Sequence, residues 1–145
     1  MKNSLLMAAM VLLPISAMAE VTVSDGWARA SILASRPAAA YLTLTSDRED
    51  RLVEIASPIA GHVTLHAVET DAVGVNRTVE IEALNLPAGE PVTLAPGGMH
   101  LMLMNVSEKL EEGTLLPLTL TFASGARMDI TVPVLGPGAS GPKDD

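Results

Sequence analysis

Three methionines crowd around one histidine in residues 97–104, which read Gly-Gly-Met-His-Leu-Met-Leu-Met. Thioether sulfur and imidazole nitrogen are soft to borderline donors of the kind that select Cu(I). Outside this segment and the first nineteen residues the chain holds only one more methionine, Met128, so the enrichment is local. Methionine also fills gaps among leucines in apolar cores. The segment alone therefore fits a copper-binding element and a core strand equally well.

The spacing of the donors decides which of them can share one ion. Residues two apart in a β-strand share a face and lie about 6.6 Å apart, so His100 and Met102 can converge on one metal ion. Met104 shares their face but lies roughly 13 Å from His100 along the strand, and we expect it to be a packing neighbour. Met99 points to the opposite face of a regular strand, unless the preceding glycines distort the backbone.

A further donor can come from residues 62–68, where hydrophobic and polar residues alternate. The polar face of this predicted strand carries His62, Thr64 and His66. His66 is the candidate ligand, although a single histidine on a half-exposed strand is more often only a surface residue. His62 lies about 13 Å from His66 in an extended chain, so we do not expect the two histidines to bind one ion.

Other kinds of chemistry find little support in the composition. The chain has no cysteine, which excludes zinc–thiolate and iron–sulfur sites. It contains no Gly-x-Ser-x-Gly motif, no zinc-binding His pair on a predicted helix and no paired-carboxylate signature, so we expect no enzymatic activity. Three aromatic residues are too few for base stacking, and the net charge of −8 disfavours nucleic acid as a partner.

The first nineteen residues have the features of an export signal. Lys2 supplies the positive start, and residues 5–13 form an apolar stretch too short to span a bilayer. Ala17-Met18-Ala19 then provides a small-x-small cleavage site. We therefore predict a periplasmic protein that does not insert into the membrane after cleavage, because no later apolar run is long enough to cross it.

The rest of the chain reads as about eight short strands separated by turns rich in glycine, proline and charged residues. Strands at this spacing predict an all-β, Greek-key antiparallel sandwich or barrel. We expect residues 1–19 to form the signal peptide, 20–135 a single β-sandwich domain, and 136–145 a disordered tail. Within the domain, we expect residues 47–51 to form a solvated turn. Residues 38–46 alternate, with Leu42 and Leu44 on one side, and we expect residues 118–122 to pair with 128–132 across a hairpin turn at 124–125.

With the motif Pro-Gly-Gly-x-His-x-Met at residues 96–102, the chain resembles the PCuAC family of exported bacterial copper-binding proteins. The resemblance covers about residues 21–134, and its most specific element is Pro-Gly-Gly-x-His-x-Met. The segments that carry it are 25–30 (Asp-Gly-Trp-Ala-Arg-Ala), 39–45 (Ala-Ala-Tyr-Leu-Thr-Leu-Thr), 57–66, 86–89 (Leu-Pro-Ala-Gly), 96–104 and 117–122 (Pro-Leu-Thr-Leu-Thr-Phe).

The resemblance implies a cupredoxin-like fold that binds Cu(I) through two histidines and methionines. His66 matches the first histidine of the family pattern, and His100 with Met102 matches the distant His-x-Met pair. The family's intermediate methionine, about eleven residues after the first histidine, is replaced in the segment 75–78 (Val-Asn-Arg-Thr). We therefore expect weaker binding than in a four-ligand relative, and weaker still if Arg77 lies over the site, since its charge repels a cation.

The leading hypothesis is a monomeric periplasmic Cu(I) chaperone with His66, His100 and Met102 as ligands. Met99 and Met104 are secondary candidates. Its partners would be the copper ion and a protein that donates or accepts copper, and the resemblance implies delivery toward the copper centres of cytochrome c oxidase. The alternative is a copper-free envelope module that scaffolds an assembly and retains a degenerate metal site. An electron-transfer copper protein is disfavoured, because blue-copper sites use a cysteine thiolate.

Overall fold

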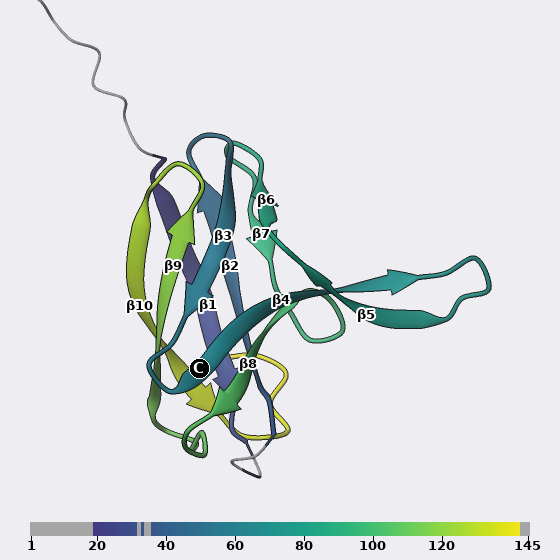
Figure 1. Ribbon diagram of the computed structural model, residues 1–145, viewed down its shortest axis with the longest axis vertical. Coiled ribbons are helices and arrows are strands. Elements are labelled where there is room, and N and C mark those ends of the chain that lie inside the picture. The colour runs from purple at the N-terminus through teal and green to yellow at the C-terminus, as the bar shows by residue number, and fades with distance from the viewer. Residues whose placement is uncertain (1–18, 32, 34–35, 143–145) are drawn as a thin grey trace, which may run out of the picture.

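The computed structural model describes residues 19–31, 33 and 36–142, so the predicted signal peptide lies outside the described residues except for Ala19. The described chain forms ten strands (Figure 1) and includes no helix that could cross a membrane. The strands are β1 (Val21–Arg29), β2 (Ala38–Ser46), β3 (Asp50–Ala56), β4 (Ala60–Thr70), β5 (Asn76–Ile81), β6 (Leu84–Leu86), β7 (Val92–Thr93), β8 (His100–Val106), β9 (Leu115–Phe122) and β10 (Arg127–Leu135).

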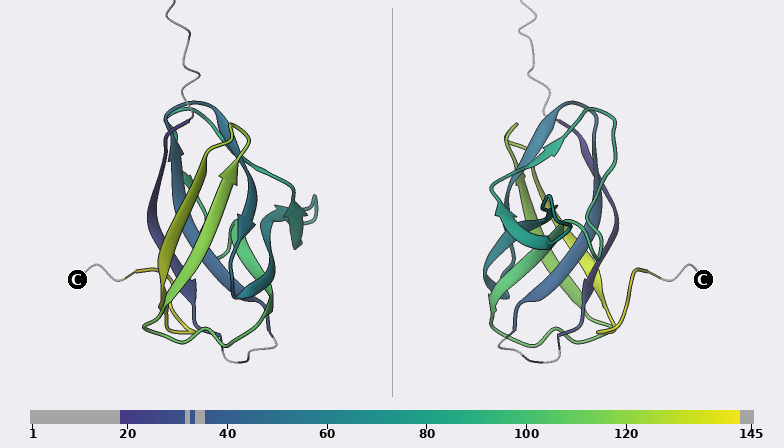
Figure 2. Two further views of the ribbon diagram at one scale, coloured as in Figure 1. Left: turned by 60° about the vertical axis from the view of Figure 1, so that its left-hand side comes forward. Right: turned by 90° about the vertical axis from the view of Figure 1, so that its right-hand side faces the viewer.

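The strands follow one continuous hydrogen-bonded path that wraps around a common core (Figure 2). Its order is β5-β4-β8-β2-β1-β10-β9-β3-β6, and the short β7 pairs with β2. The predicted all-β fold class is confirmed. One pairing departs from the expected antiparallel arrangement, because β1 runs parallel to β10 and thereby joins the first strand of the domain to its last.

Alternating side chains build the core, as the sequence pattern predicted. In β2, Leu42 and Leu44 are buried in the main hydrophobic cluster. The predicted hairpin at 124–125 is confirmed, since Leu118 pairs with Ile130 and Leu120 with Met128. Burial of such apolar surface is the main stabilising contribution to a domain of this size.

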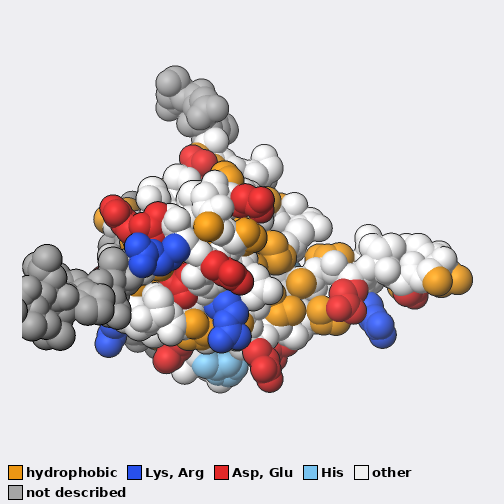
Figure 3. Space-filling model, turned by 90° about the horizontal axis from the view of Figure 1, so that it is seen from above, with side chains coloured by type: hydrophobic (Ala, Val, Ile, Leu, Met, Phe, Trp, Pro, Cys, Tyr) orange, Lys and Arg blue, Asp and Glu red, His pale blue; other side chains and the backbone are white. Residues whose placement is uncertain are grey.

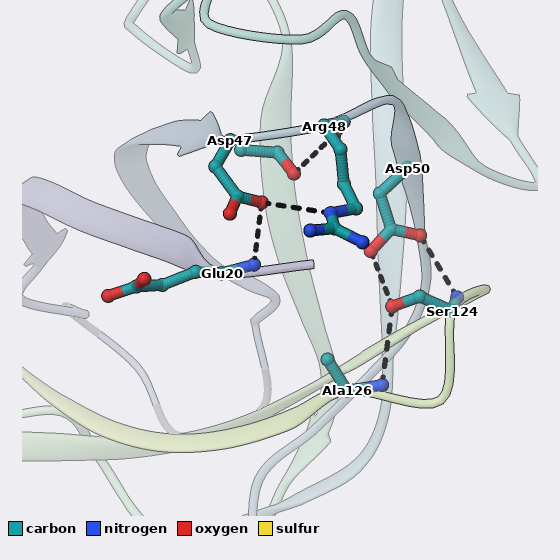
Figure 4. A network of polar contacts seen from close by, with 7 residues as sticks. Glu20, Asp47, Arg48, Asp50, Ser124 and Ala126 are labelled. Atoms are coloured by element: carbon teal, nitrogen blue, oxygen red, sulfur yellow. Dashed lines mark hydrogen bonds and ion pairs between the residues drawn. The ribbon is translucent and has the colours of Figure 1, made fainter. Parts of the chain in front are cut away.

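The expected solvated turn at residues 47–51 is shorter than predicted. β3 already begins at Asp50, whose side chain is only 6% exposed. The Ser124 hydroxyl donates to one carboxylate oxygen at 2.7 Å, and the Ser124 amide donates to the other at 3.0 Å (Figure 4). The same hydroxyl accepts from the Ala126 amide. The carboxylate thus fastens the start of β3 to the turn between β9 and β10, a contact between residues far apart in the sequence.

This buried carboxylate predicts a pH-dependent stability. Burial raises the pKa of Asp50, but hydrogen bonds from the Ser124 hydroxyl and from the amides of Arg51 and Ser124, together with the Arg51 charge, bring it below its ordinary value. A lowered folded-state pKa stabilises the protein above the unfolded-state pKa of about 4, and this stabilisation is lost as the pH falls through the lower folded-state value. We expect Asp50→Asn to cost about 1–3 kcal/mol at pH 7.

Urea denaturation of wild type and Asp50→Asn between pH 7 and pH 2 measures this effect. The stability difference should shrink below about pH 4, while Glu49→Gln at an exposed neighbouring position should have little effect at any pH. A difference between wild type and Asp50→Asn that stays constant across the titration would show that the Asp50 charge is not the stabilising feature.

A long hairpin of β4 and β5 projects from the body of the domain (Figure 1). Its tip exposes Val73, 84% accessible, and Val75, 55% accessible, and lies apart from the body in the view from above (Figure 3). The first half of β4 instead pairs with β8 in the body of the sheet. Strand β4 therefore links the arm to the strand that carries the methionine cluster.

The predicted disordered tail is described as far as residue 142. In this part Arg29 Nε donates to the carbonyl of Ala139 at 3.0 Å. The Arg29 guanidinium also lies 5.8 Å from the ring centre of Trp27 and 5.6 Å from that of Tyr41, which stack on each other at 4.5 Å. Arg29 therefore links the start of the tail to a buried aromatic pair of β1 and β2.

Candidate metal site

The two segments singled out in the sequence lie side by side as antiparallel neighbours, β4 and β8. Three register pairs follow one another along them: His66 with His100, Thr64 with Met102, and His62 with Met104. Partners in an antiparallel pair lie on the same face of the sheet, so the side chains of these six residues share one face. We call this set the donor ladder.

The opposite face of the same two strands points into the core. Leu101 and Leu103 are fully buried, and Leu65 is 3% exposed. Because strand residues alternate between faces, this burial places the donor ladder on the outer side of the sheet. The residues of the ladder are half-buried, apart from the exposed His62. A metal ion could therefore reach the ladder from solvent without the core opening.

His66 and His100 are the closest pair of candidate ligands. Their ring centres lie 5.4 Å apart, with the ring planes tilted by 41°. Metal–imidazole bonds are about 2 Å long, so both rings can reach one ion placed between them. Both histidines were candidate ligands from the sequence, and they lie close together because the register of β4 and β8 pairs them.

Hydrogen bonds orient both imidazoles. His100 Nδ1 donates to the carbonyl of Gly98 at 3.0 Å, which leaves Nε2 with its lone pair available for a metal. A second hydrogen bond of this kind fixes the tautomer and ring orientation of histidine ligands in metal sites. His66 Nε2 lies 2.9 Å from the Thr64 hydroxyl, so Nδ1 is its unengaged nitrogen. A carbonyl of the turn before β8 thus orients the His100 ring, and a hydroxyl of β4 orients the His66 ring.

The methionines of the segment take three different places. Met102 lies one register pair along the ladder from the histidines, and its neighbour on β2 is the small Ala39. Met104 shares the face but pairs with His62, at the far end of the ladder. Met99 packs against the hydrophobic core and lies before the first residue of β8. The arrangement favours Met102 as the sulfur donor to the histidine pair and sets Met99 apart from it.

Strand β5 pairs with the other edge of β4, and its register shows whether Arg77 lies over the donor ladder. Arg77 pairs with Glu69, whereas His66 pairs with Glu80. Since residues 66 and 69 point to opposite faces of β4, Arg77 does not share the face of the donor ladder. The residue beside the histidines is Glu80, a carboxylate that favours a nearby cation and that the sequence pattern did not single out.

Within the described residues, no three histidine and carboxylate side chains converge as a metal-binding group. A site with three side-chain ligands drawn from the histidines and methionines of the donor ladder would therefore include at least one thioether. Such a donor set favours Cu(I) and disfavours harder ions such as Mg²⁺ or Ca²⁺, which require several oxygen ligands.

Comparisons with known proteins agree with this fold. The family described as "Putative lipoprotein LpqE-like" matches residues 21–134. A "Putative lipoprotein Lxx21020" from Leifsonia xyli subsp. xyli (strain CTCB07) is 31% identical over 114 residues, which are 79% of this chain and 69% of that protein.

Three solved structures are also similar. The apo PCuAC domain of PmoF2 superposes with a TM-score of 0.71 at 26% identity, covering 87% of this chain and 98% of that one. The copper-bound PCuAC domain of PmoF2 gives 0.69 at 28% identity, with coverages of 83% and 97%. The solution structure of CuI-DR1885 from Deinococcus radiodurans gives 0.60 at 29% identity, with coverages of 77% and 75%. The predicted cupredoxin-like fold is confirmed.

Proposed function

Because the chain belongs to the family of LpqE-like lipoproteins, which spans nearly all of the predicted β domain, we propose that it is a Cu(I)-binding metallochaperone. The observation that carries the proposal is the register pair His66–His100, with ring centres 5.4 Å apart on an outer sheet face. Met102 adds a sulfur donor on that face. Two of the similar structures, the copper-bound PmoF2 domain and CuI-DR1885, hold copper on the same fold.

In this proposal the ligands are His66, His100 and Met102, and the protein has no catalytic role. Cu(I) tolerates low coordination numbers, so two imidazoles and one thioether suffice to hold it. Because the ligands lie on an outer face, a partner protein can add its own donors and withdraw the ion by ligand exchange. The hydrogen bond from His100 to Gly98 keeps the imidazole in place while the ion leaves.

We further propose an exported, envelope-associated protein that acts in the periplasm as a monomer. The export signal predicted for residues 1–19 and the lipoprotein names of the family and of the Leifsonia relative support this location. The proposed recipient of the ion is a protein that assembles the copper centres of cytochrome c oxidase. The acidic surface, with a net charge of −8, favours a recipient with a basic contact patch.

Thermal unfolding tests the proposal directly. A ligand that binds only the folded state stabilises it by RT ln(1 + [L]/Kd), which is about 2.7 kcal/mol when the free ligand is at 100 times Kd. Adding Cu(I) under reducing, anaerobic conditions should therefore raise the melting temperature by several degrees. An unchanged melting temperature, together with no copper on purification from copper-supplemented cells, would support the copper-free scaffolding module.

The face assignment of β5 gives a gain-of-function prediction. Glu80 is the register partner of His66, whereas Arg77 belongs to the opposite face. Glu80→Met should add a thioether next to the histidines and raise Cu(I) affinity by roughly tenfold, equivalent to about 1.4 kcal/mol. A competition titration with a chromophoric Cu(I) chelator measures the change.

Two matched variants separate sulfur from charge and position. Glu80→Gln removes only the carboxylate and should weaken binding by a few-fold at most, because exposed charge pairs contribute about 0.2–1 kcal/mol. Arg77→Met places the sulfur at the spacing of the family's intermediate methionine but on the wrong face, and should not increase affinity. A gain from Arg77→Met equal to that from Glu80→Met would refute the face assignment.

A further inference from the structure

We infer that the far end of the donor ladder, His62 with Met104, is a second and weaker Cu(I)-binding station. The inference builds on the proposed function, which assigns copper to the His66–His100 end. His62 and Met104 are register partners, so an imidazole and a thioether lie next to each other on adjacent strands. Directly opposed side chains in an antiparallel pair have Cβ atoms about 4.5–5.5 Å apart, within the span of two bonds to one ion.

The backbone draws β4 and β8 together at this end. A Cβ atom placed on Gly61 would lie only 2.9 Å from the Asn105 Cβ, closer than two real side chains allow. Asn105 adopts a positive φ of 51°, a conformation that asparagine tolerates better than most residues. These two residues directly adjoin His62 and Met104. The close approach therefore holds the second pair of donors within reach of each other.

Exposure separates the two ends of the ladder. His62 is exposed, whereas His66, His100, Met102 and Met104 are half-buried. An ion bound by His62 and Met104 would have two protein donors and free access to solvent or to a partner's ligands. We therefore expect weaker binding and faster exchange at this end than at the His66–His100 end.

Met102 lies between the two ends, one register pair from each. Consecutive register pairs on one face are about 6.6 Å apart along the strand, and the methionine side chain is long and flexible. Its sulfur can turn toward either pair of donors. The ladder thus forms a path of soft donors along which Cu(I) enters at His62–Met104 and moves to His66–His100, or leaves in the reverse direction.

The test is a Cu(I) titration of the signal-cleaved protein against a chromophoric chelator, with the metal ion alone as probe. Wild type should bind two ions, the second at least tenfold more weakly. The double variant His62→Asn/Met104→Leu should bind one ion with the tighter affinity unchanged. Met128→Leu, a matched methionine replacement in β10, should still bind two. Methyl NMR of Met104 should respond to the second equivalent of Cu(I) and not to the first.

The outcomes separate this inference from the proposed function. If wild type binds a single ion that His100→Ala removes, the second station does not exist and the chaperone proposal stands. A second ion that persists in the double variant would also overturn the inference. If wild type binds no Cu(I), both proposals fail.

Discussion

Replacing His100 with alanine should lower the Cu(I) affinity by at least roughly 100-fold. Loss of a hydrogen-bond partner that only orients a ligand costs 10–100-fold in metal affinity, and the loss of a direct ligand should cost at least as much. The ring centres of His100 and His66 lie 5.4 Å apart. The Nδ1 of His100 donates a hydrogen bond to the Gly98 carbonyl, so its Nε2 is directed away from that backbone group. Competition titration against a Cu(I) chelator measures the loss.

The control for this variant is His62→Asn, which removes an imidazole from the same face but from the other end of the ladder. The tighter Cu(I) affinity should be unchanged in this control. Met102→Leu should weaken binding as well, because leucine keeps the volume of the side chain and removes the sulfur. Equal tight affinities in wild type, His100→Ala and Met102→Leu would eliminate the proposed site.

Leu101→Ala should destabilise the fold by about 2–5 kcal/mol, the usual cost of emptying a fully buried leucine site. Leu101, which lies between His100 and Met102 in the sequence, is completely buried and pairs with Leu65 on β4. The alternation of faces on β8 places it in the core and its two neighbours outside. Urea denaturation at neutral pH, evaluated by linear extrapolation, measures the difference.

Met102→Leu serves as the stability control one residue away. Exchange of methionine for leucine conserves volume and usually costs less than about 1.5 kcal/mol, so this variant should lose copper affinity and keep its stability. Leu101→Ala should instead lose stability, and the fraction of this variant that remains folded should keep its copper affinity. If Met102→Leu unfolded the protein while Leu101→Ala did not, the assignment of the two faces of β8 would be wrong.

The alternation of hydrophobic and polar residues was sufficient to predict much of this fold. The faces of β2, the hairpin of β9 and β10, and the grouping of His100 with Met102 all follow from a period of two. These are local properties of single strands, or of strands joined by a short turn. The donors of β8 could therefore be named without knowledge of any distant contact.

The sequence pattern could not give the register between distant strands. His66 was a candidate because of its residue type, its place on a polar strand face and its match to the first histidine of the family pattern. Its position opposite His100 depends on how β4 aligns with β8, which is set by packing of buried residues such as Leu65 and Leu101. A shift by one residue would have moved every side chain to the other face.

Two further features depend on the same kind of nonlocal contact. Spacing alone placed Arg77 where the family carries a methionine, but pairing with Glu69 turns it to the opposite face and brings Glu80 beside His66. Asp50 looked like part of a charged turn. Its burial depends on a contact with the turn that contains Ser124, which is distant in the sequence.

The central claim is that one copper ion is held by two imidazoles and one thioether from β4 and β8. X-ray absorption spectroscopy on protein loaded with one equivalent of Cu(I) counts these neighbours directly. We predict two nitrogen neighbours and one sulfur neighbour in wild type, and loss of the sulfur neighbour in Met102→Leu. A copper environment without imidazole nitrogen, or a sulfur neighbour that survives in Met102→Leu, would contradict this account.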